Sequence, residues 1–349
     1  MRALQYMRFG GPISLVDLPE PVAGPTDAVV QVTASGLCRS DWHGWQGHDS
    51  DVRPPQVPGH ELAGTIVALG RQVCGWKVGQ RVTVPFVCAC GTCGECARGR
   101  QQVCARQRQP GFTDPGSFAE RVLIPAAQVN LVGLPEQVPD AAAALLGCRY
   151  GTAWHGLFAR ANLRAGQTLA VFGMGGVGLA CLQIGRAAGA RVVAVDRSAA
   201  ALDLAVALGA SGRVHAAGSA ADVAAAVREV AGADVDVGVD AAGSVPAASA
   251  SVLALRRGGR HVQIGLLPPA AGPAALPMHR AIAYELTLLG SHGIAAHEYP
   301  PLLAAVADGE LDPLRLITRE VDLAAAAVEL AGMGSRAGAG VTIVRPAAE

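Results

Sequence analysis

The sequence lacks any long uninterrupted apolar run and contains few charged residues. Only 16% of its 349 residues are charged, yet no apolar stretch approaches the about 20 residues that a helix needs to span a bilayer. The first stretch, MRALQYMRFGGPISLVDLPEP, does not have the charged-then-apolar pattern and small-residue cleavage site of a secretory leader. We therefore expect a globular, cytoplasmic protein with no membrane partner.

An excess of positive charge is also missing. Twenty-eight basic side chains balance twenty-eight acidic ones, and no basic run stands out. Proteins that bind nucleic acids or anionic membranes present concentrated basic surfaces. The sequence therefore argues against a nucleic-acid partner and favours a small molecule as the ligand.

The chain is rich in hydrophobic residues, at 51%, and longer than one hydrophobic core supports, so we expect two domains. Residues 1 to about 125 alternate short strand-like runs with glycine, proline and aspartate and show no evident helix, which predicts an antiparallel, barrel-like domain. The pattern changes near residue 150, so we expect this domain to cover residues 1–149. Residues 150–289 alternate apolar strands with alanine-rich helices, which predicts an α/β domain built on a doubly wound parallel sheet. In residues 290–349 we expect two helices and a final strand. This segment is too short to form a domain of its own, so we expect it to pack with one of the two domains.

A glycine-rich loop in the second domain indicates a dinucleotide site. Gly173, Gly175 and Gly178 have G-x-G-x-x-G spacing between an expected strand and an expected helix. The first two glycines permit a tight turn and a close approach of pyrophosphate, and the third lets the helix pack on the strand. The helix N-terminus, at Gly176 and Val177, offers free N–H groups to phosphate. The alternative is a plain tight turn, but the flanking strand and helix favour the dinucleotide.

The next expected strand ends in an acidic residue that bears on the choice of coenzyme. Asp196 lies eighteen residues beyond Gly178, where a carboxylate accepts the ribose hydroxyls of NAD and repels the 2′-phosphate of NADP. Arg197 complicates this preference, because an arginine beside the ribose can accommodate that phosphate. The sequence favours NAD and leaves NADP open.

Five cysteines lie close together in the stretch CACGTCGECARGRQQVC. Cys90, Cys93, Cys96 and Cys104 are separated by two, two and seven residues, a spacing that allows four thiolates to close a tetrahedron around a structural zinc ion. A reactive or redox-active cluster is the alternative. Cys88 is offset by two residues from Cys90, which suits strand alternation, and we expect it to be a free thiol.

Three further metal-binding residue types are scattered along the chain. Cys38, His60 and Cys148 lie in SGLCRSDWHG, VPGHELAG and LLGCRYG. Taken singly, each has an ordinary explanation, since cysteine is often a small buried residue and histidine a surface or core residue. Together with the four-cysteine lobe and GMGGVG, however, these motifs have the order and spacing of zinc-dependent medium-chain alcohol dehydrogenases. The chain resembles this family over essentially its whole length.

The resemblance implies a GroES-like β-barrel catalytic domain over residues 1–149 and a Rossmann coenzyme domain over residues 150–289. It also implies that residues 290–349 return to the catalytic domain and that the active site lies in the cleft between the domains. The family's shorter bacterial members suggest a homotetramer, or else a homodimer. The implied partners are a small alcohol or carbonyl substrate and NAD.

The resemblance further implies two zinc ions per chain. Cys38, His60 and Cys148 match the ligands of the catalytic zinc, whose fourth position stays open for water or a substrate oxygen. Ser40 lies two residues after Cys38 and matches the hydroxyl that passes the alcohol proton through the coenzyme ribose to the histidine at His43. A turn hydroxyl and a solvated histidine are the ordinary alternatives for these two residues.

Two of the three charged residues near these motifs, Asp41 and Glu61, match further family positions. Asp41 matches the carboxylate that hydrogen-bonds the zinc histidine, here His60, and Glu61 matches a glutamate that can enter the zinc coordination shell. Arg39 is a candidate contact for the coenzyme pyrophosphate. A helix cap, a solvated glutamate and a surface arginine are the respective alternatives.

The substrate pocket is less readable from the sequence. Trp42, Trp45, Phe86 and Trp154 lie near motif positions and suggest an aromatic wall for a bulky or aryl alcohol, although core packing explains them equally well. Two other functions remain open, namely a reductase of conjugated C=C bonds on the same scaffold and a non-catalytic protein that binds zinc and nucleotide. No role is assigned to His292 or His297.

Overall fold

The computed structural model describes residues 1–267, 274–334 and 339–346, which form two compact units. The first unit contains Met1–Gly151 and most of the chain from Gly293 onward, and the second contains Thr152–His292. No helix among the described residues combines the length and the apolar character needed to cross a membrane.

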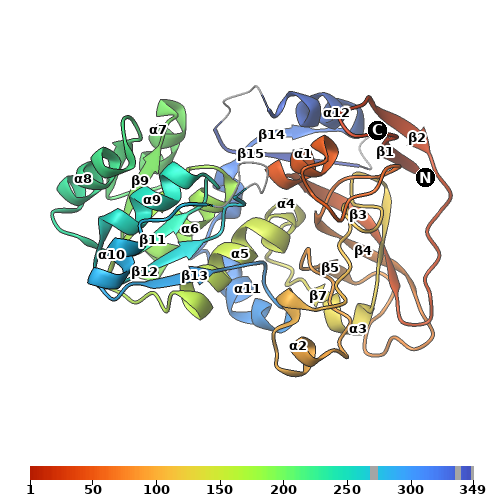
Figure 1. The fold of residues 1–349 in the computed structure, drawn as a ribbon. Coiled ribbons are helices and arrows are strands. Elements are labelled where there is room, and N and C mark those ends of the chain that lie inside the picture. Colours follow the sequence, from red (N-terminus) through yellow and green to blue (C-terminus); the bar gives the residue numbers. More distant parts are fainter. Residues whose placement is uncertain (268–273, 335–338, 347–349) are drawn as a thin grey trace. The chain divides into compact units, whose positions relative to one another are not determined.

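The first unit is organised around a mostly antiparallel sheet (Figure 1). Its strands lie in the order β14 (Ile317–Val321), β15 (Val341–Val344), β3 (Ala28–Leu37), β4 (Glu61–Leu69), β5 (Arg81–Thr83) and β7 (Val132–Gly133), with β6 (Arg121–Ile124) also pairing with β3. A separate hairpin joins β1 (Arg2–Tyr6) and β2 (Ile13–Asp17). Because β15 pairs antiparallel with β3, the end of the chain completes the sheet that its beginning started.

Short helices complete the first unit. They are α1 (Arg39–Gln46), α2 (Gly94–Ala97), α3 (Ala127–Asn130), α4 (Asp140–Ala144), α11 (Tyr299–Ala307) and α12 (Leu323–Gly332). Helix α4 runs into a wider, π-type turn over Leu146–Tyr150 and then into α5 (Gly151–Trp154). The two helices predicted near the end of the chain are confirmed as α11 and α12, whereas β14 was not expected.

The prediction that no helix precedes about residue 125 is wrong, because α1 lies within that range. This helix has no aliphatic residue and contains Gly44, so it shows no apolar periodicity. Its ends are instead fixed by local contacts. The Asp41 carboxylate accepts the backbone N–H of Cys38, and Gly47 closes the helix with a left-handed φ of 77°.

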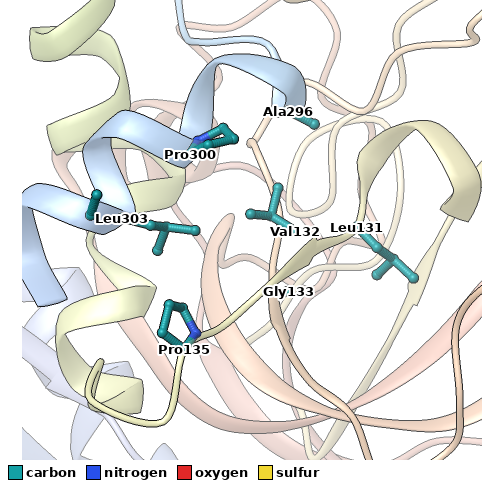
Figure 2. A pocket seen from close by; sticks show the side chains of 8 residues that line it. Leu131, Val132, Gly133, Pro135, Ala296, Pro300 and Leu303 are labelled. Atoms are coloured by element: carbon teal, nitrogen blue, oxygen red, sulfur yellow. The ribbon is translucent and has the colours of Figure 1, made fainter.

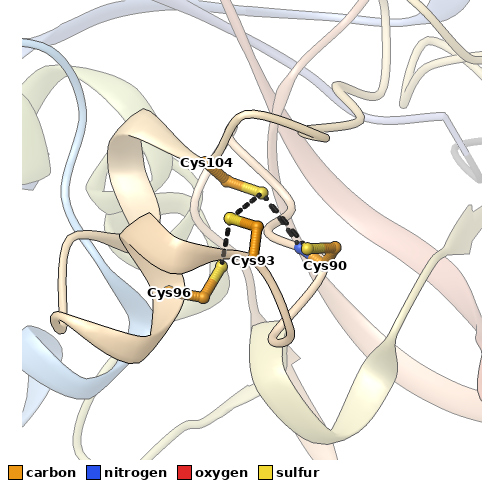
Figure 3. Close-up of side chains that lie close together, drawn as sticks. All are labelled: Cys90, Cys93, Cys96 and Cys104. Carbon is orange, nitrogen blue, oxygen red and sulfur yellow. Dashed lines mark hydrogen bonds between the residues drawn. The ribbon is translucent and has the colours of Figure 1, made fainter.

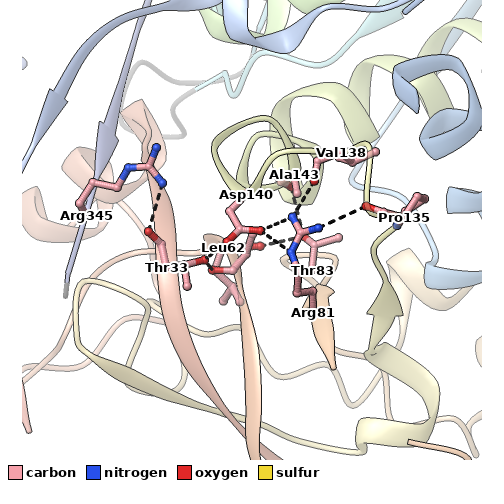
Figure 4. A network of polar contacts seen from close by, with 10 residues as sticks. Thr33, Leu62, Arg81, Thr83, Pro135, Val138, Asp140, Ala143 and Arg345 are labelled. Carbon is pink, nitrogen blue, oxygen red and sulfur yellow. Dashed lines mark hydrogen bonds and ion pairs between the residues drawn. The ribbon is translucent and has the colours of Figure 1, made fainter. Parts of the chain in front are cut away.

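A polar network ties the strands of this unit to α4 (Figure 4). The Asp140 carboxylate accepts hydrogen bonds from the Thr33 hydroxyl, at 2.7 Å, and from Arg81 Nε, at 3.0 Å. Arg81 also donates to the carbonyl of Val138, and Arg345 donates to the carbonyl of Thr33. The start of α4 is therefore anchored to β3 and β5, which fixes the segment that leads to Cys148.

The second unit contains a six-stranded parallel sheet. The strands lie in the order β10 (Gly212–His215), β9 (Arg191–Asp196), β8 (Thr168–Phe172), β11 (Val235–Asp240), β12 (Leu255–Gln263) and β13 (Thr287–Gly290). The connecting helices are α6 (Gly176–Ala187), α7 (Ala199–Ala207), α8 (Ala220–Ala231), α9 (Val245–Ala254) and α10 (Met278–Ala283). From β8 the chain adds strands toward one edge of the sheet as far as β10, and from β11 it adds them toward the other edge. Doubly wound sheets have such a switch, here between β8 and β11, and bind ligands beyond the carboxyl ends of the strands beside it. The predicted α/β fold class is confirmed.

Candidate functional site

The three scattered metal-binding residues lie together in the first unit. Cys38 directly follows β3, His60 directly precedes β4, and Cys148 belongs to the π-type turn. One ligand atom from each of these residues and one from Glu61 all lie within 4.8 Å of one another, and all four residues are buried. Folding thus brings three distant segments to one point, as a zinc site requires.

The Asp41 carboxylate fixes the orientation of the His60 ring. Its Oδ1 lies 2.8 Å from Nδ1 of His60 and also accepts the N–H of Gly59 at 3.0 Å. Because an ionised carboxylate only accepts, Nδ1 carries a proton, and Nε2 is the ring nitrogen left for a metal. That Nε2 is buried and has no hydrogen-bond partner among the described residues. A buried ring nitrogen without a partner beside two thiols fits a zinc ligand.

The charges around this cluster perturb both thiols. A hydrogen bond from Cys148 lowers the pKa of Cys38 well below its usual range, with further contributions from His60 and Arg149. The same hydrogen bond, together with burial, raises the pKa of Cys148. Burial opposes the charged form of His60, but Asp41 and Cys38 together raise its pKa. The site therefore stabilises a thiolate, which is the form that binds metal.

Glu61 is fully buried beside the cluster and is paired with an arginine that the sequence analysis missed. Arg149 Nη1 lies 3.2 Å from Glu61 Oε2. Burial raises the pKa of the Glu61 carboxyl, and the Arg149 cation opposes that effect. The available signal was the position of Arg149, a charged residue directly after the predicted ligand Cys148 in an otherwise apolar stretch.

The predicted proton-relay residues lie on α1, the helix that Cys38 caps. Ser40 is half-buried in the first turn. His43 lies one turn further, with its Nδ1 2.9 Å from Nδ1 of His48. Burial lowers the pKa of His43, and the neighbouring His48 and Arg39 lower it further. His43 is therefore favoured as a neutral base.

The aromatic residues expected at the substrate wall lie in different places. Phe86 packs with Cys38 and Cys148, and its ring lies 6.0 Å from the His60 ring. Trp45 instead belongs to a core cluster and donates its indole N–H to the carbonyl of Gly11. Phe112 was not expected near this site; its ring centroid lies 5.1 Å from that of His60, and it packs in the same core cluster as Trp45.

The other two tryptophans of this set, and Arg39, make local contacts. Trp42 contacts the rings of His43 and His48 edge-on, and the exposed Arg39 guanidinium lies 5.8 Å from the Trp42 ring. Trp154, which belongs to the second unit, packs edge-on against Phe158.

The four-cysteine lobe forms a second, separate cluster (Figure 3). The sulfur of Cys93 lies 3.5 Å from that of Cys96 and 3.6 Å from that of Cys104, and Cys104 lies 3.5 Å from Cys90. Four sulfurs bound to one zinc at about 2.3 Å each would lie roughly 3.8 Å apart. The observed spacings fit such a closed tetrahedral site.

Cys88 belongs to neither cluster. It is 1% exposed and packs among the aliphatic side chains of the sheet core in the first unit. Burial raises its pKa to about 12, so the thiol stays protonated. The prediction of a strand-like position and a free thiol agrees with this placement.

The glycine-rich loop of the second unit follows β8 and opens α6. Gly173 has a φ of 99°, and a Cβ there would lie 2.7 Å from the backbone nitrogen of Ala242. A Cβ at Gly178 would lie 1.7 Å from the Gly173 carbonyl oxygen, so the close packing of α6 against the loop that follows β8 requires glycine at this position. A Cβ at Gly175 would meet nothing within 4 Å. The side of the loop at Gly175 is therefore open to a ligand, as a pyrophosphate site requires.

The predicted ribose carboxylate lies beside this loop at the end of β9. Asp196 accepts the backbone N–H groups of Met174, at 2.5 Å, and Ser198, at 2.8 Å. The Arg197 carbonyl oxygen accepts a hydrogen bond from His215 Nε2 at 2.9 Å. Asp196 is thus held by the glycine-rich loop itself.

A surface groove of about 440 Å³ lies away from the predicted site residues (Figure 2). Its lining is apolar and comes from the segment around β7 and from α11, including Val132, Pro135, Pro300 and Leu303. None of the eight residues that line it is a predicted ligand or relay residue. The groove therefore adds nothing to the argument for catalysis.

Comparisons with known proteins agree with this geometry. Residues 24–136 match the alcohol dehydrogenase GroES-like domain, and residues 176–308 match the zinc-binding dehydrogenase domain. The chain is 31% identical to an L-threonine 3-dehydrogenase of Deinococcus radiodurans over 322 residues, which cover 91% of this chain and 90% of that protein.

Two solved structures are similar over almost the whole chain. An NAD-dependent alcohol dehydrogenase has a TM-score of 0.87 and 29% identity, covering 99% of this chain and 100% of that one. A zinc-binding dehydrogenase from Sinorhizobium meliloti bound to NADP also has a TM-score of 0.87, with 30% identity and 99% coverage of both chains. With its two domain matches and its buried cysteine and histidine cluster, the chain belongs to the zinc-dependent medium-chain dehydrogenase family and is an oxidoreductase of the alcohol dehydrogenase type.

Proposed function

We propose that the protein is an NAD-dependent alcohol dehydrogenase that transfers hydride reversibly between a primary or secondary alcohol and NAD. The observation that carries this proposal is the buried cluster of Cys38, His60 and Cys148, in which Nε2 of His60 has no hydrogen-bond partner among the described residues. Two thiolates and one imidazole hold zinc with one position left for substrate. Residues 1–149 and 290–349 would carry this chemistry, and residues 150–289 would bind the coenzyme.

The reaction needs a Lewis acid and a hydride acceptor. A zinc ion held by Cys38, His60 and Cys148 supplies the first when bound, and NAD supplies the second. Asp41 keeps the His60 ring in the tautomer with a free Nε2. Phe86 packs beside the ligands and excludes water from their surroundings.

Ser40 and His43 would carry the alcohol proton away. The Ser40 hydroxyl would accept this proton as it gives up its own, and His43 would accept the proton that leaves the site. In the tautomer in which His43 Nδ1 donates to His48, the proton is accepted by His43 Nε2. The lowered pKa of His43 keeps that nitrogen unprotonated and ready to accept.

The proposed coenzyme is NAD. The open side of the loop at Gly175 suits a pyrophosphate, and the free N–H groups at Gly176 and Val177 suit its charge. Asp196 supports NAD because its carboxylate repels a 2′-phosphate. Two observations favour NADP instead, namely Arg197 next to Asp196 and the NADP bound in one of the similar solved structures.

The substrate is proposed to be an apolar, bulky or aryl alcohol. The ring of Phe86 lies beside His60, Cys38 and Cys148 and would favour such a group over the charged amino acid for which the threonine dehydrogenase relative is named. We also propose a structural zinc in the four-cysteine lobe and a cytoplasmic location, where the nine unpaired cysteines stay reduced. Assembly as a homotetramer or homodimer stays a prediction.

One experiment tests the proposed function. Zinc per chain is measured in the purified protein, and reduction of NAD and of NADP is followed with benzyl alcohol, short secondary alcohols and L-threonine. Two zinc ions and NADH formation with the aryl alcohol are the expected result. One zinc without turnover would favour the non-catalytic alternative, and hydride transfer only to conjugated enones would favour the C=C reductase.

A further inference from the structure

A buried ion pair beside the proposed metal site takes no part in the steps described so far. Arg149 and Glu61 are 3% and 0% exposed, respectively. Arg149 contacts both carboxylate oxygens of Glu61. Its backbone N–H donates to Oε1 at 3.1 Å, and its guanidinium Nη1 lies 3.2 Å from Oε2. One residue therefore reaches both oxygens of this carboxylate.

The neighbouring strand leaves room for this carboxylate. Gly36 of β3 is paired with Glu61 of β4 in the sheet, and a Cβ at Gly36 would lie 2.0 Å from Glu61 Oε2. The guanidinium itself is anchored from the other side, because Arg149 Nη2 donates to the carbonyl of Leu37. Strand β3 thus shapes the pocket in which the two charges meet.

The carboxylate is also within reach of the metal site. One Glu61 oxygen lies within 4.8 Å of the ligand atoms of Cys38, His60 and Cys148. Glu61 Oε2 and Arg149 Nη1 attract each other as charges, but neither has a hydrogen bond among the described residues. Glu61 could therefore pair either with the guanidinium or with a metal cation.

We propose that Arg149 is a positioning residue that holds the Glu61 carboxylate off the metal and so keeps the fourth ligand position open for the alcohol oxygen. The proposal rests on the metal site of the proposed function. A buried carboxylate needs a cationic partner. While Arg149 supplies that partner, the metal does not have to. Without Arg149, the metal becomes the cation available to Glu61.

The test uses the full-length protein loaded with Co²⁺ in place of zinc and reads the visible absorption spectrum, which reports the ligands of the ion. The variants are E61Q, R149M and the double variant R149M/E61Q. We expect E61Q to leave the spectrum unchanged, because Glu61 is not a ligand while Arg149 is present. R149M should change the spectrum, and adding E61Q should restore it.

A second readout is the rate at which a chelator removes the metal from this site. R149M should release it at least about tenfold more slowly than the wild type, since changes around metal ligands alter affinity on that scale. The double variant should return to the rate of E61Q. R149Q, which is neutral but still forms hydrogen bonds, replaces R149M in the same comparison if R149M does not fold.

Two results would overturn the inference. A changed spectrum in E61Q would mean that Glu61 is already a ligand beside Arg149. Identical spectra and release rates in R149M and the double variant would mean that Glu61 never reaches the metal. Binding of only one Co²⁺ per chain, in the four-cysteine lobe, would instead remove the proposed catalytic site itself and the inference with it.

Discussion

At the scale of single residues, Asp41 makes three hydrogen bonds beside the proposed metal site. Its two oxygens accept hydrogen bonds from the Cys38 and Gly59 backbones and from the His60 ring. One carboxylate therefore caps α1, orients the loop before β4 and selects the tautomer of a proposed ligand. The sequence presents a helix cap and a partner of His60 as alternatives for Asp41, and in the structure the two oxygens of this one carboxylate do both.

Replacing Asp41 by asparagine should weaken zinc binding at the Cys38 site. The asparagine amide is uncharged, so the His60 imidazole becomes less basic and binds zinc more weakly. We expect a loss of about 10-fold to 100-fold in zinc affinity. Competition with a chromophoric chelator measures it, and the four-cysteine lobe of the same protein is the internal control. Unchanged affinity at the Cys38 site would show that Asp41 acts as a cap alone.

His261 in the second unit should make stability depend on pH. It is 1% exposed, and burial lowers its pKa to about 4, against a smaller opposing effect of Gln263. In the unfolded chain His261 binds a proton as the pH falls below about 6.5, whereas in the folded protein it stays neutral down to about pH 4. The free energy of unfolding should therefore be unaffected by this residue above pH 6.5 and should decrease as the pH falls from 6.5 toward about 4.

The measurement is the urea midpoint of the second unit at pH 7.5 and pH 4.5, for the wild type and for H261N. The wild type should lose more stability than H261N on acidification, because the asparagine does not titrate. Equal losses in the two proteins would mean that His261 is not kept neutral by the fold.

At the scale of elements, the glycine-rich loop allows the fold and the ligand site to be tested separately. A Cβ at Gly175 would meet no protein atom within 4 Å. We therefore expect G175A to change the free energy of unfolding by less than about 0.5 kcal/mol. Its methyl group would occupy the side of the loop proposed for pyrophosphate, so the Michaelis constant for NAD should rise clearly.

Gly178 is the contrasting position in the same loop. A Cβ there would lie 1.7 Å from the Gly173 carbonyl oxygen, so G178A should destabilise the second unit itself. Denaturation followed together with NAD titration distinguishes the two variants. A normal NAD response in G175A would show that the coenzyme does not approach this side of the loop.

Strand β3 has a comparable steric limit at Gly36. A Cβ at that position would lie 2.0 Å from Glu61 Oε2, and overpacking of a buried site typically costs about 1–3 kcal/mol. We expect G36A to lower the free energy of unfolding by that amount. G290A is the matched control, because a Cβ at Gly290 meets nothing within 4 Å. A similar loss in both variants would point to general strand effects.

Helix α1 shows where sequence analysis fails at this scale. Its residues lack apolar periodicity, so the usual helix signal is missing, although Asp41 and Gly47 provide its caps. By contrast, β9 ends at Asp196, where the sequence predicts the end of a strand, because a buried parallel strand is apolar through most of its length. Local patterns therefore predicted the second unit better than the segment that carries the proposed relay.

At the scale of the whole molecule, the two proposed metal sites should respond differently to mutation. The lobe of Cys90, Cys93, Cys96 and Cys104 is a closed set, so C96S should first lower the thermal midpoint. C38A should abolish turnover and leave that midpoint nearly unchanged. Thermal denaturation and activity measured on C96S and C38A show which cluster supports stability and which supports turnover. A stable but inactive C96S would mean that the two roles are reversed.

The whole-molecule comparison also shows the limits of sequence reasoning. The four-cysteine lobe could be predicted from spacing alone because its ligands are close in sequence. Cys38, His60 and Cys148 could be grouped only through the family resemblance, since no local pattern says that three distant segments meet. The pairing of Arg149 with Glu61 was missed for the same reason, as were the positions of Phe112 and His48.

The pairing of β15 with β3 has a consequence for the order of synthesis. Thr342 lies opposite Leu37, the residue before Cys38. At this end β3 also pairs with β4, so it gains its second neighbour, β15, only after Thr152–His292 has left the ribosome. We expect the parallel-sheet unit to be able to fold on the nascent chain, whereas the sheet beneath the proposed metal site is completed last. Zinc capture at Cys38 would then be among the latest events in making the protein.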